Sequence, residues 1–194
     1  FDKLIFKKHS HIIYDFDDSI YLFDKYKKIP FYINNSCSII VGNNILEEYA
    51  KNYNKNTFNI PTVLDINQYF VKDKNELRDN AVRIGWSGFN DTVDQTIEFF
   101  KPILTELSIS HKFKFVLITN DPPKTLNLEQ IDYEIISWNR QIEVSSIQTL
   151  DIGIMPLIDN EFNKGKCGFK LIQYGAVGLP SVASAIGFNN EILL

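Results

Sequence analysis

Cysteine is scarce in this sequence of 194 residues, which contains only Cys37 and Cys167, far apart along the chain. Neither belongs to a CxxC pair or to a histidine-rich stretch, so the sequence indicates neither a disulfide framework nor a zinc site. Reduced thiols are typical of the cytosol. We therefore predict a cytoplasmic protein.

Long apolar runs are also missing, since no stretch approaches the ~20 residues of a membrane span. The N-terminus lacks the apolar stretch and the small-residue cleavage site of a signal peptide. Positive charge is not in excess either, because the formal net charge is -4 and the sequence pI is about 5.4. We expect no nucleic-acid partner and at most peripheral contact with a membrane.

Apolar residues make up 44% of the chain, which is enough to bury a core. The length suits one large domain, or one domain with part of another. The sequence starts at Phe1 without an initiator methionine and stops at Leu194, where another helix would begin. We therefore expect a fragment of a longer protein.

Short β-rich strings alternate with helical patterns along the chain. A connector with Pro61 and a charged, polar segment at residues 71–80 predict a domain boundary near residues 62–80. The alternation predicts an α/β fold with a Rossmann-like parallel sheet, helices on both faces and ligands at the carboxyl ends of the strands. We expect strands at residues 11–14, 38–41, 81–86, 113–119, 133–137, 151–155 and 181–183, helices at 45–53, 91–107, 142–149 and 168–177, and an extended connector at 57–65.

The segment 164–184 is the most informative, because it combines a basic, glycine-containing loop with a helix and a strand. Gly168 permits close approach to the first turn of the helix, and Lys166 and Lys170 add positive charge to its free N–H groups. Gly178 suits a left-handed position at the end of this helix. We interpret the loop as an anion site, with a solvated surface turn as the alternative.

Three further loops after predicted strands carry candidate binding residues. Gly85 and Gly88 lie on either side of Ser87. They allow backbone amides to approach a ligand oxygen, although a tight turn also explains them. Trp138 can stack on a base, or it can serve packing alone. Glu191 can accept a hydrogen bond from a hydroxyl, or it can act as a favourable charge in the first turn of a helix.

An acidic turn follows the first predicted strand. Asp15, Asp17 and Asp18 lie so close together that their carboxylates repel unless they are hydrated, bound to metal or hydrogen-bonded. They are therefore functional candidates, and solvated turn residues are the alternative.

Several strings of this sequence occur in the order seen in retaining glycosyltransferases of group 1. The chain resembles these family 4-like enzymes over nearly its whole length. The strings that carry the resemblance are residues 43–50, 60–65, 84–88, 151–157, 165–174 and 178–184.

The resemblance implies a B-type glycosyltransferase fold of two Rossmann-like domains, which together need ~300 residues or more. Residues 1–64 would be the C-terminal part of the acceptor-binding domain, and residues 65–194 a donor-binding domain truncated at its C-terminus. The implied activity is hexosyltransferase-like: transfer of a sugar, with retention, from a nucleotide-diphosphate donor to a hydroxyl of a glycan or lipid-linked acceptor, in bacterial glycan or polysaccharide synthesis. Neither a cofactor nor a metal is implied.

The residue roles that the resemblance implies include two departures from the family pattern. The paired glutamates of the family fall on Gly165 and Gln173, and residues 89–92 lack the usual basic residue, for which Lys166 and Lys170 can substitute. Asp17 or Asp18 would orient the acceptor, while the leaving diphosphate helps to deprotonate it. The implied donor-binding residues are Gly85, Ser87, Gly88, Trp138, Lys166, Gly168, Phe169, Lys170, Gln173 and Glu191.

Two alternatives stay open at this point. The acidic turn also resembles the first motif of haloacid-dehalogenase-type phosphatases, with Asp15 as nucleophile, Asp17 as general acid and Thr119 in the second motif. A protein that binds nucleotide sugar without turning it over is the non-enzymatic alternative.

Overall fold

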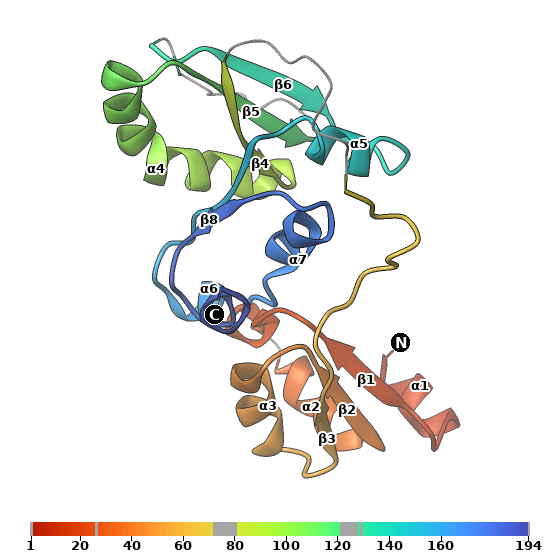
Figure 1. Ribbon diagram of the computed structural model, residues 1–194. Helices are drawn as coiled ribbons and strands as arrows, with labels where there is room; N and C mark the ends of the chain where they lie inside the picture. Colours follow the sequence, from red (N-terminus) through yellow and green to blue (C-terminus); the bar gives the residue numbers. More distant parts are fainter. Residues whose placement is uncertain (1, 26, 72–80, 121–127, 129, 194) are drawn as a thin grey trace. The chain divides into compact units, whose positions relative to one another are not determined.

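The computed structural model (Figure 1) describes residues 2–25, 27–71, 81–120, 128 and 130–193, without the side chains of residues 2, 3 and 90–94. Most of the predicted charged segment 71–80 lies outside the described residues. The chain divides into two compact units. Unit 1 comprises Phe1–Val63, Asp159–Phe169 and Ala185–Leu194, and unit 2 comprises Leu64–Ile158 and Lys170–Ser184.

Unit 1 is built on a three-stranded parallel sheet with the strand order β1-β2-β3. The strands are β1 (Ile13–Phe16), β2 (Ser38–Val41) and β3 (Thr57–Asn59). The helices are α1 (Asp2–Lys8), the 3-10 helix η1 (Ile20–Phe23), α2 (Lys28–Asn35), α3 (Asn44–Lys51), α6 (Glu161–Lys164) and α8 (Asn189–Ile192).

The core of unit 1 draws on residues from distant parts of the sequence. Ile39 and Val41 of β2 are fully buried, as are Ile33 of α2 and Leu46 of α3. Cys167, from the predicted anion-binding loop, belongs to the same cluster and is 6% exposed. The loop is therefore packed into unit 1, and it is not a solvated turn.

Unit 2 is built on a five-stranded parallel sheet with the strand order β6-β5-β4-β7-β8. The strands are β4 (Val82–Ser87), β5 (Phe113–Thr119), β6 (Tyr133–Ser137), β7 (Ile152–Met155) and β8 (Ser181–Ala183). The helices are α4 (Asn90–Ser110), α5 (Glu143–Ile147) and α7 (Phe169–Ala176), and α7 begins at the last residue before the unit boundary.

Helices cover both faces of the sheet in unit 2. On one face, Phe100 and Leu104 of α4 pack against Phe115 and Leu117 of β5, in line with the position of α4 beside β4 and β5 in Figure 1. On the other face, Gly153 of β7 lies against the ring of Tyr174 in α7. The predicted α/β class with Rossmann-like parallel sheets is confirmed.

The end of α7 is also as predicted. Gly178 has φ 68°, in the left-handed region that favours glycine. The Gly178 N–H donates to the Gly175 carbonyl at 3.0 Å, and the Leu179 N–H donates to the Tyr174 carbonyl at 2.9 Å. This pair of hydrogen bonds is a Schellman motif, which satisfies two carbonyls at the end of the helix.

Several local predictions differ from the structure. The predicted connector 57–65 begins with strand β3, and Gly85 and Ser87 lie within β4 and not in the loop that follows it. The short helices α1, α2 and α6 were not predicted, whereas α8 lies where the sequence suggested the start of another helix, with Glu191 in its first turn. Among the described residues, no helix has both the length and the apolar character needed to cross a membrane.

Candidate functional site

The predicted site residues lie in both units. Because the carboxyl ends of parallel strands meet at one edge of a sheet, the loops that follow them converge there. We describe each edge separately. Unit 1 holds Asp17, Asp18, Lys166, Gly168, Phe169 and Glu191, and unit 2 holds Gly85, Ser87, Gly88, Trp138, Lys170 and Gln173.

In unit 1 the acidic turn after β1 contacts the loop that carries Lys166 and Cys167. Asp18 Oδ1 lies 3.6 Å from Lys166 Nζ. The Cys167 thiol donates to the Asp17 carbonyl at 3.0 Å, and burial raises the pKa of this thiol. The Lys166 ammonium also lies 4.7 Å from the centroid of the Phe162 ring. The predicted anion ligand Lys166 is thus oriented by a carboxylate and an aromatic ring.

Asn43 joins α3 to the same loop, and sequence reasoning missed this role. Its Oδ1 accepts the Leu46 N–H at 3.0 Å, which caps α3. Its Nδ2 donates to the Gly165 carbonyl at 2.8 Å and to Cys167 Sγ at 3.4 Å. An asparagine before a predicted helix signals a cap, but nothing in the sequence signals the contact with residues 165–167.

The remaining unit 1 candidates lie around this loop. The Glu191 carboxylate accepts a hydrogen bond from Asn44 Nδ2 at 3.3 Å. Gly168 has φ 65°, and the Phe169 side chain is 42% exposed. Among the described residues, no group of His, Cys, Asp and Glu side chains is arranged to hold a metal ion.

In unit 2 the end of β4 carries an aromatic ring and a cation. Trp86 is 3% exposed, and Lys170 Nζ of α7 lies 5.3 Å from its ring centroid. A side chain at Gly88 would collide with the Trp86 ring, and one at Gly85 would collide with Leu150. The two glycines therefore permit close packing at this edge.

A chain of four polar groups follows at the same edge of unit 2. Trp138 Nε1–H donates to Glu143 Oε1 at 3.0 Å, and the Tyr69 hydroxyl donates to Glu143 Oε2 at 3.3 Å. Gln173 Nε2 in turn donates to the Tyr69 oxygen at 2.8 Å. Sequence reasoning found Trp138 and Gln173 but missed Tyr69 and Glu143.

The strand order of this sheet reverses its direction next to β4. From β4 the chain proceeds to β5 and β6 on one side, and then returns to β7 and β8 on the other side of β4. In open parallel sheets ligands bind outside the carboxyl ends of the strands at such a reversal. Gly88 follows β4 directly, and Lys170 contacts Trp86 of the same strand.

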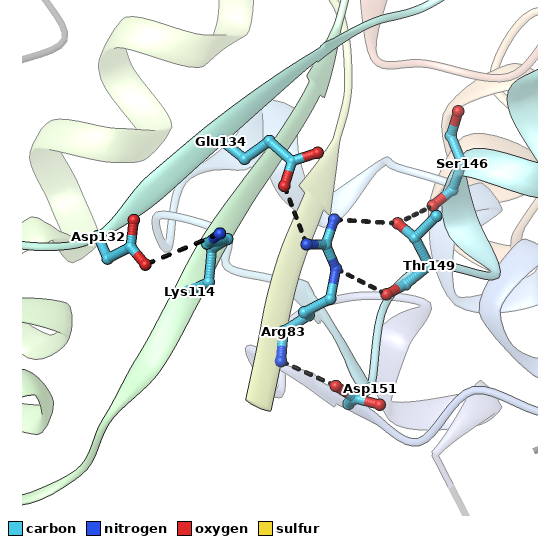
Figure 2. Close-up of polar contacts among 7 residues, drawn as sticks. All are labelled: Arg83, Lys114, Asp132, Glu134, Ser146, Thr149 and Asp151. Carbon is cyan, nitrogen blue, oxygen red and sulfur yellow. Dashed lines mark hydrogen bonds and ion pairs between the residues drawn. The ribbon is translucent and has the colours of Figure 1, made fainter. Parts of the chain in front are cut away.

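A second polar cluster lies near the amino end of β4 (Figure 2). Arg83 Nη1 donates to Glu134 Oε2 at 2.9 Å, and Arg83 Nε donates to the Thr149 carbonyl at 2.9 Å. The Arg83 N–H donates to Asp151 Oδ2 at 2.9 Å. The hydrogen bond from Arg83 lowers the pKa of Glu134. The cluster lies at the opposite end of β4 from Gly88. We therefore infer that its role is to stabilise the fold of unit 2.

An apolar hollow of about 430 Å³ lies on the α4 face of unit 2. Among the described residues that line it, including Phe99, Ile103 and Val182, none is charged. Ligand sites usually add a few convergent polar groups to an apolar lining. The carboxyl edge of the sheet has such groups, so it is the stronger candidate.

No family model matches the chain, and no curated protein matches it. Strand β1, with Asp15, belongs to the three-stranded sheet of unit 1, and β5, which ends at Thr119, belongs to the five-stranded sheet of unit 2. The phosphatase alternative stays a prediction.

Proposed function

We propose that the protein is a retaining glycosyltransferase that takes a sugar from a nucleotide-diphosphate donor. The observation that carries this proposal is the reversal of strand order at β4 and β7, with the Lys170 ammonium 5.3 Å from the Trp86 ring centroid. A cation at the carboxyl edge of a doubly wound sheet suits a nucleotide diphosphate. The resemblance in sequence supports the same activity.

In this proposal the residues of unit 2 bind the donor. Lys170 attracts the diphosphate and stabilises the negative charge that develops on it as the sugar leaves. The bond from the anomeric carbon to the diphosphate breaks, and its electron pair stays on the diphosphate. The new bond forms to the acceptor oxygen on the same face, and the hydroxyl proton passes to the departing diphosphate.

In unit 1 the proposal separates the two candidate acids. The Asp18 carboxylate faces Lys166 at 3.6 Å, so it serves to orient that lysine. The Asp17 side chain is exposed, while its carbonyl holds the Cys167 thiol. We therefore assign the orientation of the acceptor hydroxyl to Asp17 and not to Asp18.

The first test is calorimetric titration with UDP and GDP. Lys170→Ala removes the cation at the edge of β4 and should weaken binding about tenfold to a hundredfold, because hydrogen bonds to charged groups contribute about 1.5–3 kcal/mol. Lys114→Ala is the matched control, since this partly exposed lysine faces Asp132 near the amino end of β5. Equal binding by the two variants would contradict the role of Lys170.

A transfer assay then separates enzyme from binding protein. The proposal expects release of a nucleoside diphosphate from a donor that binds, with retention of configuration in the product. Asp17→Asn should lower the rate of transfer and leave donor affinity unchanged, because this residue acts on the acceptor. Donor binding with no transfer to any glycan acceptor would favour a donor-binding protein without turnover.

A further inference from the structure

The 3-10 helix η1 of unit 1 exposes three apolar side chains. Ile20 is 38% exposed, Leu22 is 45% exposed and Phe23 is 68% exposed, although the Phe23 ring also contacts the Phe162 ring at a centroid distance of 5.1 Å. Single exposed apolar residues are common on protein surfaces, but groups of them mark contacts with a partner or a membrane. We call the side chains of Ile20, Leu22 and Phe23 the apolar tip.

The neighbours of the apolar tip in the sequence hold it outside the core. Tyr21, the remaining residue of η1, packs against the core of unit 1 and stacks on Tyr49 of α3 at a centroid distance of 3.5 Å. Ser19, directly before η1, is fully buried. After η1, Asp24 Oδ2 accepts the Ile29 N–H at 2.6 Å. Because the chain is anchored on both sides of η1, the tip projects from a fixed base.

Positive charge gathers directly behind the apolar tip. Residues 24–28 contain Lys25, Lys27 and Lys28, all of them exposed, and one acidic residue, Asp24. The formal net charge of the whole chain is -4, so this local excess of lysine is opposite in sign to the average. An anionic surface would attract this segment and repel much of the rest of the chain, which would give the contact a defined orientation.

We propose that the apolar tip and the three lysines behind it bind the surface of a membrane that contains anionic lipids. The side chains of the tip enter the boundary between headgroups and acyl chains, and the lysines contact the lipid phosphates. A protein partner fits this surface less well, because lysine is depleted in the cores of protein interfaces.

The membrane contact bears on the acceptor of the proposed transfer. Asp17, to which we assign the acceptor hydroxyl, lies three positions before Ile20 in the sequence. With the tip in the membrane, Asp17 lies near the lipid headgroups, where a lipid-linked acceptor presents its hydroxyl. We therefore favour a lipid-linked acceptor over a free glycan. This choice of acceptor rests on the proposed function, whereas the membrane contact does not.

Flotation with lipid vesicles tests the contact without any nucleotide. The protein should float with vesicles of phosphatidylcholine and phosphatidylglycerol, and much less with phosphatidylcholine alone, because the lysines require anionic lipid. Phe23→Ser should weaken binding about tenfold, because it removes the largest apolar side chain of the tip. Ile109→Ser is the matched control, since Ile109 is 84% exposed but lies beside Glu106 on α4 of unit 2.

Reversal of charge tests the role of the lysines. Lys25→Glu combined with Lys27→Glu should weaken binding to the anionic vesicles at least about fiftyfold. Lys112→Glu, which reverses an exposed lysine before β5 of unit 2, should have a much smaller effect. Because all these side chains are exposed, thermal unfolding without vesicles should stay close to that of wild type, and it separates loss of binding from loss of the fold.

A fluorescent side chain reports whether the tip enters the bilayer. The emission of Phe23→Trp should shift to shorter wavelengths on addition of anionic vesicles, and lipids with brominated acyl chains should quench it. Ile109→Trp, in the control position, should show neither change.

The outcomes separate the membrane contact from the proposed function. Equal flotation of wild type, Phe23→Ser and the double lysine variant would overturn the membrane contact. Failure of wild type to float with anionic vesicles would also overturn it, and would favour a protein partner for the tip. Equal transfer to free and lipid-linked acceptors, with vesicle binding intact, would overturn the choice of acceptor alone. Absence of nucleotide binding would overturn the proposed function and leave the membrane contact standing.

Discussion

At the scale of single residues, Arg83 shows how one side chain and its backbone N–H hold a polar cluster together. Its guanidinium binds Glu134 and the Thr149 carbonyl, and its backbone N–H binds Asp151. Register pairs Arg83 with Lys114, so two positive side chains lie side by side on neighbouring strands. Glu134 compensates for this repulsion by accepting from Arg83.

Replacement of Glu134 should change the pH dependence of stability. Because its pKa is lower in the folded chain than in the unfolded chain, ionisation favours folding. The contribution is complete above the unfolded pKa and disappears as the pH falls through the folded pKa. Since the side chain is 40% exposed, Glu134→Gln should lower the free energy of unfolding by less than about 1 kcal/mol near neutral pH.

The measurement is urea denaturation at several pH values between neutral and acid. The difference in the free energy of unfolding between wild type and Glu134→Gln should shrink to zero as the pH falls. Asp132→Asn is the control, because Asp132 is 66% exposed and lies 3.9 Å from Lys114. A gap that stays constant with pH would contradict the role of the Arg83–Glu134 pair.

Single residues also show where sequence reasoning ends. Trp138 was found because an aromatic residue follows a predicted strand, and Gln173 was found because the resemblance in sequence places it at one of two paired glutamate positions. Tyr69 is 74 residues from Glu143 and 104 residues from Gln173, and no local pattern links such distant positions. Their hydrogen bonds exist only because the fold brings the three side chains together.

At the scale of elements, two glycines explain how α7 approaches the sheet. Gly85 of β4 and Gly153 of β7 are register partners, so they lie side by side on one face. A side chain at Gly153 would meet the ring of Tyr174, which is fully buried. The absence of a side chain at this position determines how closely the helix can pack.

Two alanine substitutions should therefore have opposite effects. Gly153→Ala should lower the free energy of unfolding by about 1–3 kcal/mol, because the added methyl group displaces Tyr174. Gly175→Ala, in α7, meets no atom within 4 Å and should raise it by about 0.5–1 kcal/mol through helix propensity. Thermal unfolding of both variants measures the difference, and losses of equal size would show that packing at Gly153 is not the cause.

Elements were predicted best where the sequence signal is local. The bounds of β2, β5, β6 and β8 agree with those expected, because each is a short apolar or β-branched run between polar residues. Strand β3 was missed because it has only three residues and Pro61 follows it closely. Helix α2 was missed because Pro30 and a β-branched and aromatic composition obscure its pattern.

At the scale of the whole molecule, unit 1 is discontinuous in sequence. It combines Phe1–Val63 with two segments from the last part of the chain, Asp159–Phe169 and Ala185–Leu194. The sequence predicted a boundary near residues 62–80, and the first division lies between Val63 and Leu64. The sequence did not predict that Asp159–Phe169 and Ala185–Leu194 belong to unit 1, since this depends on buried contacts such as those of Asn43.

Loss of Asn43 should weaken unit 1 more than loss of an ordinary helix cap. Asn43→Ala removes the cap of α3 and leaves the Gly165 carbonyl without its donor, so the free energy of unfolding should fall by about 2–4 kcal/mol. Asn160→Ala, which removes the exposed cap of α6, should lower it by about 1 kcal/mol. Chemical denaturation compares the two variants, and equal losses would rule out a special role for the contact with residue 165.

The discontinuity of unit 1 also has a consequence for synthesis on the ribosome. Domains usually fold in the order in which they are made, at about 5–20 residues per second. Residues 1–63 are made before residues 64–158, and the two later segments of unit 1, one of which adds Cys167 to the core cluster, come only after them. The core of unit 1 is therefore completed on the order of ten seconds after its first 63 residues are made. During this interval the apolar surface that Cys167 will cover is available to a chaperone.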